Sequence, residues 1–464
     1  MGASACDILL VQPPRPTWAL EFVRQTAASR PIPAPELIST ANRLREDGFR
    51  AEVLNADVYD EARCHEAISN AVASNVRAIA FLLRAYRIPA ALRLASWVSK
   101  VAHTRRPATI AFGFLPKGFG ATDAASAFNE ILLGPAWETA LAGYLDRLGV
   151  RPGPALDPKV ELGEFFELTG CSGLSACIEA PSRICPHRCI FCEHRLFDRY
   201  EDAPAHRRIR SVTEVLDELL LARKHGARSF VCLEGNFLTY HEWTAAFADG
   251  LRERFQAVPF AVGTRLSDII RSEASGELAK LVRAGLVSVC SGIESGNNEI
   301  LARARKDATT ADYVEADRIL RRFGIRRFYN IILGLPGESR DTIGQTWEFA
   351  RRLDPDGLQV SIATPLPGTP LHELAEESGW LTTTDLEYYY YYGSAVLALQ
   401  GLATDYLLKC QSAIHAEFTG HQALLLSSRH HLHARLGLGD LQSVPRCAGE
   451  KADAARGCQF GQRS

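Results

Sequence analysis

The sequence predicts an α/β protein made of three parts. These are a Rossmann-like N-terminal domain over residues 1–150, a partial (β/α)6 barrel of the TIM type over 171–371, reached through a linker at 151–170, and a helical C-terminal region over 372–464. Three observations lead to this prediction. Short apolar runs alternate with amphipathic stretches across the first domain. The same alternation resumes near residue 174. In that second region, cysteines, glycines and charged residues gather directly after the predicted strands.

The overall composition is that of an ordinary globular chain. The 464 residues are 47% apolar and 23% charged, which suits two or three domains. The net charge of −2 gives no reason to expect a nucleic acid or an anionic membrane as partner. No apolar run reaches transmembrane length, and the N-terminus lacks a basic region followed by an apolar core. We therefore expect a cytoplasmic protein whose twelve cysteines are reduced.

The N-terminal domain is predicted from five strands separated by helices. The strands are expected at 7–12, 51–54, 77–82, 108–112 and 130–133, and the helices at 35–46, 66–73, 90–101 and 137–148. Pro13 and Pro14 end the first strand, and Gly48 ends the first helix. Such alternation implies a doubly wound, mostly parallel sheet, in which ligands bind at the carboxyl ends of the strands.

The barrel is predicted from six further strands that follow the linker. They are expected at 174–180, 230–234, 259–262, 287–292, 328–333 and 358–362. Ser211 and Thr309 each begin a helix with the pattern of a capping box. In barrels of this kind the loops at the carboxyl ends of the strands carry the chemistry. Each motif described below falls on such an end.

The C-terminal region is predicted to be helical, with a short helix at 371–377 and an amphipathic helix at 405–426. Between them lies a run of five tyrosines, Tyr388 to Tyr392. Such rings favour a packed surface between domains, and the alternative is the wall of a substrate pocket.

Three cysteines follow the first barrel strand at the spacing C-x3-C-x2-C, in Cys185-Pro186-His187-Arg188-Cys189-Ile190-Phe191-Cys192. One tight loop can bring three thiolates together, and soft thiolates favour iron–sulfur clusters or zinc. A cubane cluster has four irons, so three ligands leave one iron open. The alternatives are a zinc site completed by His187 or His194, and free thiols in a loop. Zinc sites more often combine two separated pairs, and no second pair lies within easy reach.

This cysteine pattern, with an aromatic residue before the third cysteine, resembles the signature of the radical S-adenosylmethionine (radical SAM) enzymes. The resemblance spans about 176–381 and includes G-I-E-S-G at 292–296, Lys306, G-L-P-G-E at 334–338 and P-x-P-G-T-P at 365–370. It implies that Cys185, Cys189 and Cys192 ligate a [4Fe-4S] cluster whose open iron is chelated by S-adenosylmethionine. Electron transfer from the cluster then yields a 5′-deoxyadenosyl radical, and an external donor such as flavodoxin or ferredoxin is implied.

The resemblance also implies that several residues contact S-adenosylmethionine. Phe191 is expected to pack near the adenine. Glu234 and Gly235 are expected to present a carboxylate and backbone to the methionine amino group, although L-E-G-N-F stands here where D-D-N-F is more usual.

Further contacts are expected from three later strand ends. Glu294 and Ser295 would hydrogen-bond the ribose and the methionine carboxylate, and Arg265 would neutralise that carboxylate with its fork of donors. Gly334 and Gly337 would let the backbone approach the adenine. The alternative for each is structural: glycines for turns, Glu294 for a salt bridge, and Arg265 on a solvated face.

The N-terminal domain resembles the cobalamin-binding domain that precedes the barrel in one large group of radical SAM proteins. The matching features are L-L-V-x-P-P at 9–14, the helix and stop at 37–48, the strand end V-L-N-A-D at Asp57, and the turn at 134–138. The motif D-x-H-x-x-G is absent, so no histidine is evident as a lower axial cobalt ligand. The resemblance implies cobalamin as a cofactor. The alternative is a degenerate domain that binds nothing and shapes the substrate pocket.

These features together predict cobalamin-dependent methylation of an unactivated carbon. The substrate is expected to be a small metabolite, a natural-product precursor or a peptide-like molecule, with no nucleic acid or membrane partner. One alternative is a radical SAM enzyme without cobalamin that performs a rearrangement, cyclisation or oxidation. The other is a zinc-stabilised binding module without enzymatic activity.

Overall fold

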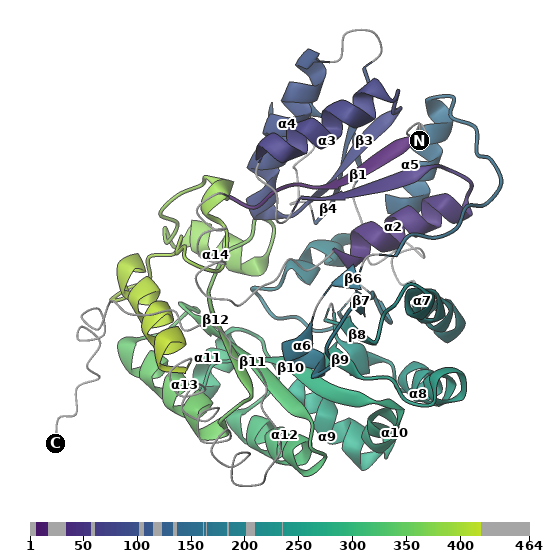
Figure 1. Ribbon diagram of the computed structural model, residues 1–464. Helices are drawn as coiled ribbons and strands as arrows, with labels where there is room; N and C mark the ends of the chain where they lie inside the picture. Colours follow the sequence, from purple (N-terminus) through teal and green to yellow (C-terminus); the bar gives the residue numbers. More distant parts are fainter. Residues whose placement is uncertain are drawn as a thin grey trace, which may run out of the picture.

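The computed structural model shows two sheets, each with its own helices, and a C-terminal segment that contacts both (Figure 1). The structure describes residues 6–16, 34–56, 61–101, 106–114, 123–132, 137–160, 162–163, 165–182, 185–200, 209–233 and 235–418. In these ranges there is no helix with the length and apolar character needed to cross a membrane.

A parallel sheet of five strands forms the upper part of the molecule in Figure 1. Its strands, in the order β2-β1-β3-β4-β5, are β1 (Ile8–Gln12), β2 (Ala51–Asn55), β3 (Ala78–Leu83), β4 (Ala108–Gly113) and β5 (Glu130–Leu132). The helices that cover it are α2 (Pro35–Glu46), α3 (Glu61–Ala73), α4 (Ile88–Val101) and α5 (Trp137–Arg147). Ile8 and Leu10 of β1 pack with α2 and α5. Leu9 and Val11 pack with α3 and α4 on the other face, because side chains alternate along a strand. The predicted doubly wound sheet is confirmed.

The strand order places a topological switch point between β1 and β3. The chain winds from β1 to β2 on one side and continues through β3, β4 and β5 on the other. In open α/β sheets, ligands bind in the crevice beyond the carboxyl ends of the strands at such a point. Gln12 ends β1 and Arg84 follows β3, so both lie at this position.

A second sheet curves into a partial barrel in the lower part of Figure 1. Its six parallel strands are β7 (Ser175–Cys177), β8 (Ser229–Cys232), β9 (Phe260–Gly263), β10 (Leu286–Glu294), β11 (Arg326–Leu333) and β12 (Gly357–Ile362). They confirm the predicted barrel. A short strand β6 (Leu162–Gly163) pairs antiparallel with β7, and α6 (Phe166–Thr169) follows it. Both lie in the segment predicted as an irregular linker, because elements this short carry no periodic signal.

Helices cover the outer face of the barrel sheet and form one large core with it. They are α7 (Val212–Lys224), α8 (His241–Phe255), α9 (Leu266–Ala274), α10 (Glu277–Ala284), α12 (Thr310–Arg322) and α13 (Arg340–Leu353). The capping boxes predicted at Ser211 and Thr309 are both formed, with Glu214 and Asp312 as their third helical residues. A small separate cluster that includes Phe165 packs against the inner face of the sheet.

The C-terminal region binds along the open side of the barrel. It contains α14 (Pro370–Glu377) and a helix at 404–418 whose Leu407 and Ile414 pack into the barrel core. The part of the predicted helix beyond residue 418 lies outside the described residues. The tyrosine run is mostly irregular and contacts the N-terminal domain: Tyr390 packs edge-on against Tyr86, with ring centroids 4.9 Å apart. Arg15 donates to the Tyr390 hydroxyl at 2.6 Å, so the predicted interdomain surface is confirmed.

Candidate functional site

The cysteine loop leaves the carboxyl end of β7 and is attached to the barrel by its backbone. Ile190 donates its N–H to the Ala304 carbonyl at 3.1 Å and accepts from Leu371 N–H at 3.0 Å. Cys189 is buried, whereas Cys185 and Cys192 are half-buried. The contacts of Ile190 therefore fix the middle of the loop between the end of α11 (Asn298–Arg303) and the start of α14.

The three thiols interact with one another electrostatically. Burial raises the pKa of Cys185, and a negative charge on Cys189 raises it further. Burial also raises the pKa of Cys192, followed by the effect of Cys185. Backbone N–H groups of His187 and His194 partly oppose these shifts. A thiolate is therefore costly in this loop unless a positive group compensates it.

The two histidines considered as a fourth zinc ligand contact other groups. His187 Nε2 lies 3.3 Å from Asn236 Nδ2, and the His194 ring packs edge-on against Phe114. Among the side chains that the structure describes, no group of three or more His, Cys, Asp or Glu is arranged to hold a single metal ion.

Arg265 connects the cysteine loop to a buried ion pair. It is the N-cap residue of α9, directly after β9, and its Nη1 lies 3.7 Å from Cys189 Sγ. Its Nη2 donates to the carbonyls of Lys306 and Asp307. Lys306 in turn places Nζ 2.7 Å from Glu294 Oε1. The alternative of a solvated face for Arg265 is thus excluded, since only 7% of the residue is exposed.

Glu294 is held in a strained conformation at the end of β10. Its φ is +57°, and the pairing of β10 with β11 shifts register between Gly292 and Glu294. The carboxylate folds back over Gly292, where an added Cβ would lie 1.9 Å from Oε1. Burial lowers the pKa of Lys306, but Glu294, Tyr313 and Cys189 together outweigh this effect, so the net pKa is raised. Glu294 Oε2 remains buried without a hydrogen-bond partner among the described residues.

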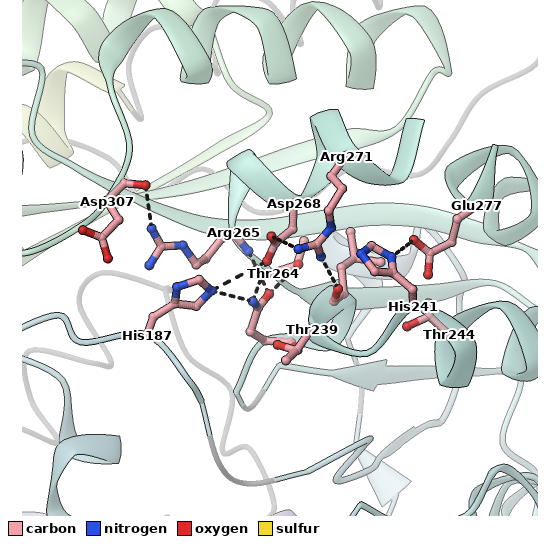
Figure 2. A network of polar contacts seen from close by, with 12 residues as sticks. His187, Thr239, His241, Thr244, Thr264, Arg265, Asp268, Arg271, Glu277 and Asp307 are labelled. Atoms are coloured by element: carbon pink, nitrogen blue, oxygen red, sulfur yellow. Dashed lines mark hydrogen bonds and ion pairs between the residues drawn. The ribbon is translucent and has the colours of Figure 1, made fainter. Parts of the chain in front are cut away.

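A polar network extends from the loop to α9 (Figure 2). His187 and Asp268 point toward each other there, with His187 Nε2 3.9 Å from Asp268 Oδ2. The Asn236 amide joins them: its Nδ2 donates to Asp268 Oδ2 at 2.6 Å, and its Oδ1 accepts from Thr264 and from Arg265 N–H. Sequence reasoning missed Asn236 and Asp268. The one available signal was the position of Asn236 in L-E-G-N-F, next to Gly235.

The strand end at 233–237 lies against the start of the cysteine loop. Gly235 has a φ of +71°, and an added Cβ would lie 2.9 Å from the Ser182 carbonyl oxygen. A side chain there would therefore clash with backbone. Glu234, which was predicted to contact the cofactor, lies outside the described residues.

The G-L-P-G-E loop after β11 is closed by its own glutamate. Glu338 Oε2 accepts N–H groups of Gly334 at 2.5 Å and Leu335 at 3.2 Å, while Oε1 is buried without a partner in the described part of the chain. Burial raises the pKa of Glu338 to about 8. Gly337 has a φ of +87°, and a Cβ there would lie 2.1 Å from Arg303 Nη1. Sequence reasoning included the glycines of this loop and missed the buried carboxyl.

Phe191 and Ser295, which were both predicted to contact S-adenosylmethionine, lie in different parts of the barrel. Phe191 packs against the apolar cluster that contains Leu335 of the G-L-P-G-E loop. Ser295 instead faces α13: its hydroxyl lies 3.0 Å from Thr346 Oγ1 and accepts from Asn297 N–H at 3.2 Å. The contact of Ser295 with a cofactor stays a prediction.

At the switch point of the N-terminal sheet, Gln12 is 6% exposed and its Oε1 has no hydrogen-bond partner among the described residues. It is thus an acceptor available to a ligand at the carboxyl end of β1. Asp57 and residues 134–136, which contributed to the predicted resemblance of this domain, lie outside the described residues.

A cavity of about 930 Å³ lies elsewhere, on the outer helices of the barrel. Trp347, Arg351 and Phe418 are among its lining residues, and none of the cysteines is. The cavity lies along α13 and reaches Gly296, the residue after Ser295, but none of the predicted site residues is among its lining residues, so we assign no part of the chemistry to it.

Comparison with known proteins agrees with this geometry. Residues 180–350 match the family model described as the radical SAM superfamily. An uncharacterized methyltransferase of Pyrococcus horikoshii is 28% identical over 210 residues, which are 45% of this chain and 44% of that protein. The chain thus matches less than half the length of the curated relatives found first.

Two solved structures share the fold. One is the radical S-adenosylmethionine methyltransferase TsrM from Kitasatospora setae with cobalamin and a [4Fe-4S] cluster bound, with a TM-score of 0.56, 16% identity, and coverage of 82% of this chain and 76% of that one. The other is the cobalamin-dependent S-adenosylmethionine radical enzyme OxsB with aqua-cobalamin and S-adenosylmethionine bound, with a TM-score of 0.60, 15% identity, and coverage of 91% and 67%. At these identities the likeness establishes the architecture of both domains.

Proposed function

Residues 180–350 belong to the radical SAM superfamily, and from this membership we propose that the chain is a cobalamin-dependent C-methyltransferase. Its substrate is an unactivated carbon of a small metabolite, a natural-product precursor or a peptide-like molecule. Cys185, Cys189 and Cys192 hold a [4Fe-4S] cluster, and S-adenosylmethionine binds beside it. A flavodoxin- or ferredoxin-type donor reduces the cluster in the cytoplasm.

The observation that carries the proposal is the set of buried charges beside the cysteine loop. Arg265 contacts Cys189 Sγ through Nη1, while its buried Nε has no partner among the described residues. Glu294 Oε2 is likewise buried and unpaired there. Unsatisfied charged atoms are costly in a folded interior unless a ligand completes them. A ligand with both an ammonium and a carboxylate, such as the methionine part of S-adenosylmethionine, supplies a donor and an acceptor for these two atoms.

When bound, the cluster supplies the electron that cleaves S-adenosylmethionine. The chain's own contribution is to bind, orient and exclude water. Lys306 fixes the Glu294 carboxylate through its 2.7 Å contact, so Oε2 is an acceptor of set position. The G-L-P-G-E loop, closed by Glu338, holds its backbone where Phe191 and Leu335 share one apolar cluster. That cluster offers an apolar surface for the adenine.

Cobalamin binding is supported by the N-terminal sheet. Its switch point carries Gln12 with a free buried acceptor, which fits a ligand rich in amide donors. TsrM and OxsB, which share the fold, were solved with cobalamin and aqua-cobalamin respectively. We therefore place cobalamin at the carboxyl ends of β1 and β3.

The test is anaerobic reconstitution with iron, sulfide and hydroxocobalamin, followed by incubation with S-adenosylmethionine and a reductant. We expect a bound cluster, bound cobalamin, and formation of both 5′-deoxyadenosine and S-adenosylhomocysteine. A chain that binds zinc and never iron would refute the radical SAM assignment. Cys189→Ala should abolish cluster assembly, and Cys232→Ala, a matched control on the outer face of β8, should retain it.

A second candidate is a radical SAM enzyme that works without cobalamin in a rearrangement, cyclisation or oxidation. One observation favours it: the Arg84 guanidinium lies 4.6 Å over the Phe114 ring, so large side chains occupy the ends of β3 and β4. This candidate predicts 5′-deoxyadenosine without S-adenosylhomocysteine, and no cobalamin uptake at any concentration tried.

A further inference from the structure

Both ends of the cysteine loop are attached to the same helix of the N-terminal domain. Before the loop, Glu179 Oε2 accepts a hydrogen bond from Ser39 Oγ of α2 at 3.0 Å. After the loop, Glu193 pairs with Arg84, and Arg84 Nη2 lies 2.7 Å from Glu36 Oε1 in the first turn of α2. Since Glu36 and Ser39 are three residues apart, they lie on one face of the helix. One turn of α2 thus holds the chain on either side of the three cysteines.

Arg84 is the central residue of this attachment. It follows β3 at the switch point of the N-terminal sheet, and its side chain is 16% exposed. The guanidinium bridges a buried carboxylate of its own domain, Glu36 (side chain 1% exposed), and the carboxylate of Glu193, which directly follows the third cysteine. Its fork of donors allows two carboxylates to be bound at once, which a lysine cannot reproduce in the same geometry.

Apolar packing supports the same junction. Arg84 lies over the Phe114 ring, and the His194 ring packs edge-on against Phe114 with centroids 6.2 Å apart. Leu196 is buried in the core of the N-terminal domain together with Phe112 and Trp137. The segment that follows the cysteines is therefore built into the N-terminal domain, although it belongs in sequence to the barrel.

We propose that Arg84 is a positioning residue that fixes the cysteine loop against the N-terminal domain and sets the charge beside the cluster. The inference rests on the proposed function, since it requires the cluster at Cys185, Cys189 and Cys192. Reduction adds one negative charge to the cluster. The Glu193 carboxylate next to Cys192 opposes that addition, and the Arg84 guanidinium offsets it. The pair also joins the end of β3, where we place cobalamin, to the residue that directly follows Cys192.

The test compares cluster midpoint potentials in four variants of the full chain after anaerobic reconstitution. They are Arg84→Gln, Arg84→Lys, Glu193→Gln and the double variant Arg84→Gln/Glu193→Gln. Potentials are measured by redox titration followed by electron paramagnetic resonance, with iron content determined in parallel. The control is Arg93→Gln on α4, which removes a half-exposed pair with Glu61 in the same domain.

We expect Arg84→Gln to shift the potential to more negative values and Glu193→Gln to shift it to more positive values. The double variant should return close to the wild type. Arg84→Lys should stay close to the wild-type potential because it keeps the positive charge, although it loses the geometry that binds both carboxylates. A purely structural role predicts shifts of one sign, or none. Arg93→Gln should leave the potential unchanged.

Unchanged potentials in both single variants, or shifts of the same sign, would overturn the inference. Should Arg84→Gln fail to assemble a cluster because the buried Glu36 carboxylate loses its contact with Arg84, the sign of the Glu193→Gln shift decides alone. A wild-type chain that assembles no cluster would refute the proposed function itself. A wild type with a cluster and insensitive potentials would refute only the role of Arg84.

Discussion

The buried pair of Lys306 and Glu294 is the residue-scale feature that most constrains the site. Both side chains are under 10% exposed, and their atoms lie 2.7 Å apart. Replacing Lys306 with Met would leave the buried Glu294 carboxylate without its ion-pair partner. We expect a loss of about 3–5 kcal/mol in the free energy of unfolding, measured by urea titration.

The control for that measurement is Lys280→Met, which breaks an ion pair with Asp249 between α10 and α8. Both of its side chains are more than 40% exposed. The expected loss is about 1 kcal/mol or less, because water screens an exposed pair. Equal losses in the two variants would contradict the buried, uncompensated carboxylate inferred for Glu294.

Glu338 predicts a dependence of stability on pH. Burial raises its pKa from 4.5 to about 8, so the folded chain keeps a proton that the unfolded chain releases. Its contribution is complete below the unfolded pKa and is lost as the pH rises through the folded pKa. Between about pH 5 and about pH 8, the free energy of unfolding should therefore fall by up to about 1.4 kcal/mol per pH unit.

Glu338→Gln should remove this slope, because the amide stays neutral and still accepts the N–H groups of Gly334 and Leu335. Glu348→Gln is the matched control on α13, since its side chain is 72% exposed. The measurement is urea-induced unfolding across the pH range. A slope that persists in Glu338→Gln would show that another group is responsible.

At this scale the sequence predicted the residues whose role depends on spacing. The three cysteines share one loop, and the resemblance to radical SAM enzymes implied Glu294 and Arg265, whose roles at a cofactor stay predictions. Asn236, Asp268 and Glu338 were missed, because their roles arise from contacts between separate strands and loops. The identity of one residue and its neighbours in sequence does not reveal contacts with a distant strand or loop. The roles of Glu234 and Ser295 at a cofactor stay predictions.

At the scale of elements, the helix at 404–418 holds the tyrosine run against the barrel. Gln411 is 1% exposed, and its Nε2 donates to the carbonyls of Val360 at 2.8 Å and Tyr391 at 3.2 Å. Its Oε1 accepts from Gly393 N–H at 3.0 Å. One side chain thus joins this helix, β12 and the segment after the tyrosines.

Gln411→Leu should release this segment. Several buried backbone groups would lose their partner, at about 1–3 kcal/mol for each one left unsatisfied. We expect faster hydrogen exchange at Tyr391 to Gly393 and a lower midpoint of urea unfolding. Ser412→Ala, at an exposed position of the same helix, should change neither measurement. Unchanged exchange in Gln411→Leu would show that the tyrosine rings alone hold the segment.

The elements themselves were predictable where the apolar pattern was long or was bounded by a strong signal. The capping boxes at Ser211 and Thr309 are examples, and the alternation of strands and helices led to both sheets. The order β2-β1-β3-β4-β5 was not readable, because it depends on which side of β1 each crossover packs. The short elements β6 and α6 were missed, because a strand of two residues and a helix of four residues are too short to show a periodic pattern of apolar side chains.

At the scale of the whole molecule, Leu196 shows how the domains share a core. It is 6% exposed and packs with N-terminal residues that include Trp137. Leu196→Ala should cost about 2–5 kcal/mol through the cavity it leaves. We expect the loss of hydrogen-exchange protection to appear in β1, β3 and α5, far from residue 196 in sequence.

Leu174→Ala is the control for this variant, because Leu174 is 41% exposed at the start of the barrel. It should leave exchange in the N-terminal sheet unchanged. If Leu196→Ala affected only the barrel, the packing of this segment into the N-terminal core would be contradicted.

The place of Leu196 in that core also bears on the order of events during synthesis. The N-terminal domain leaves the ribosome first, yet its core lacks one apolar side chain until residue 196 has emerged. By then all three cysteines of the loop have been translated as well. The core that contains Leu196 therefore completes its packing only when the three proposed cluster ligands are already outside the ribosome, so closure of that core and readiness for iron delivery would coincide in time.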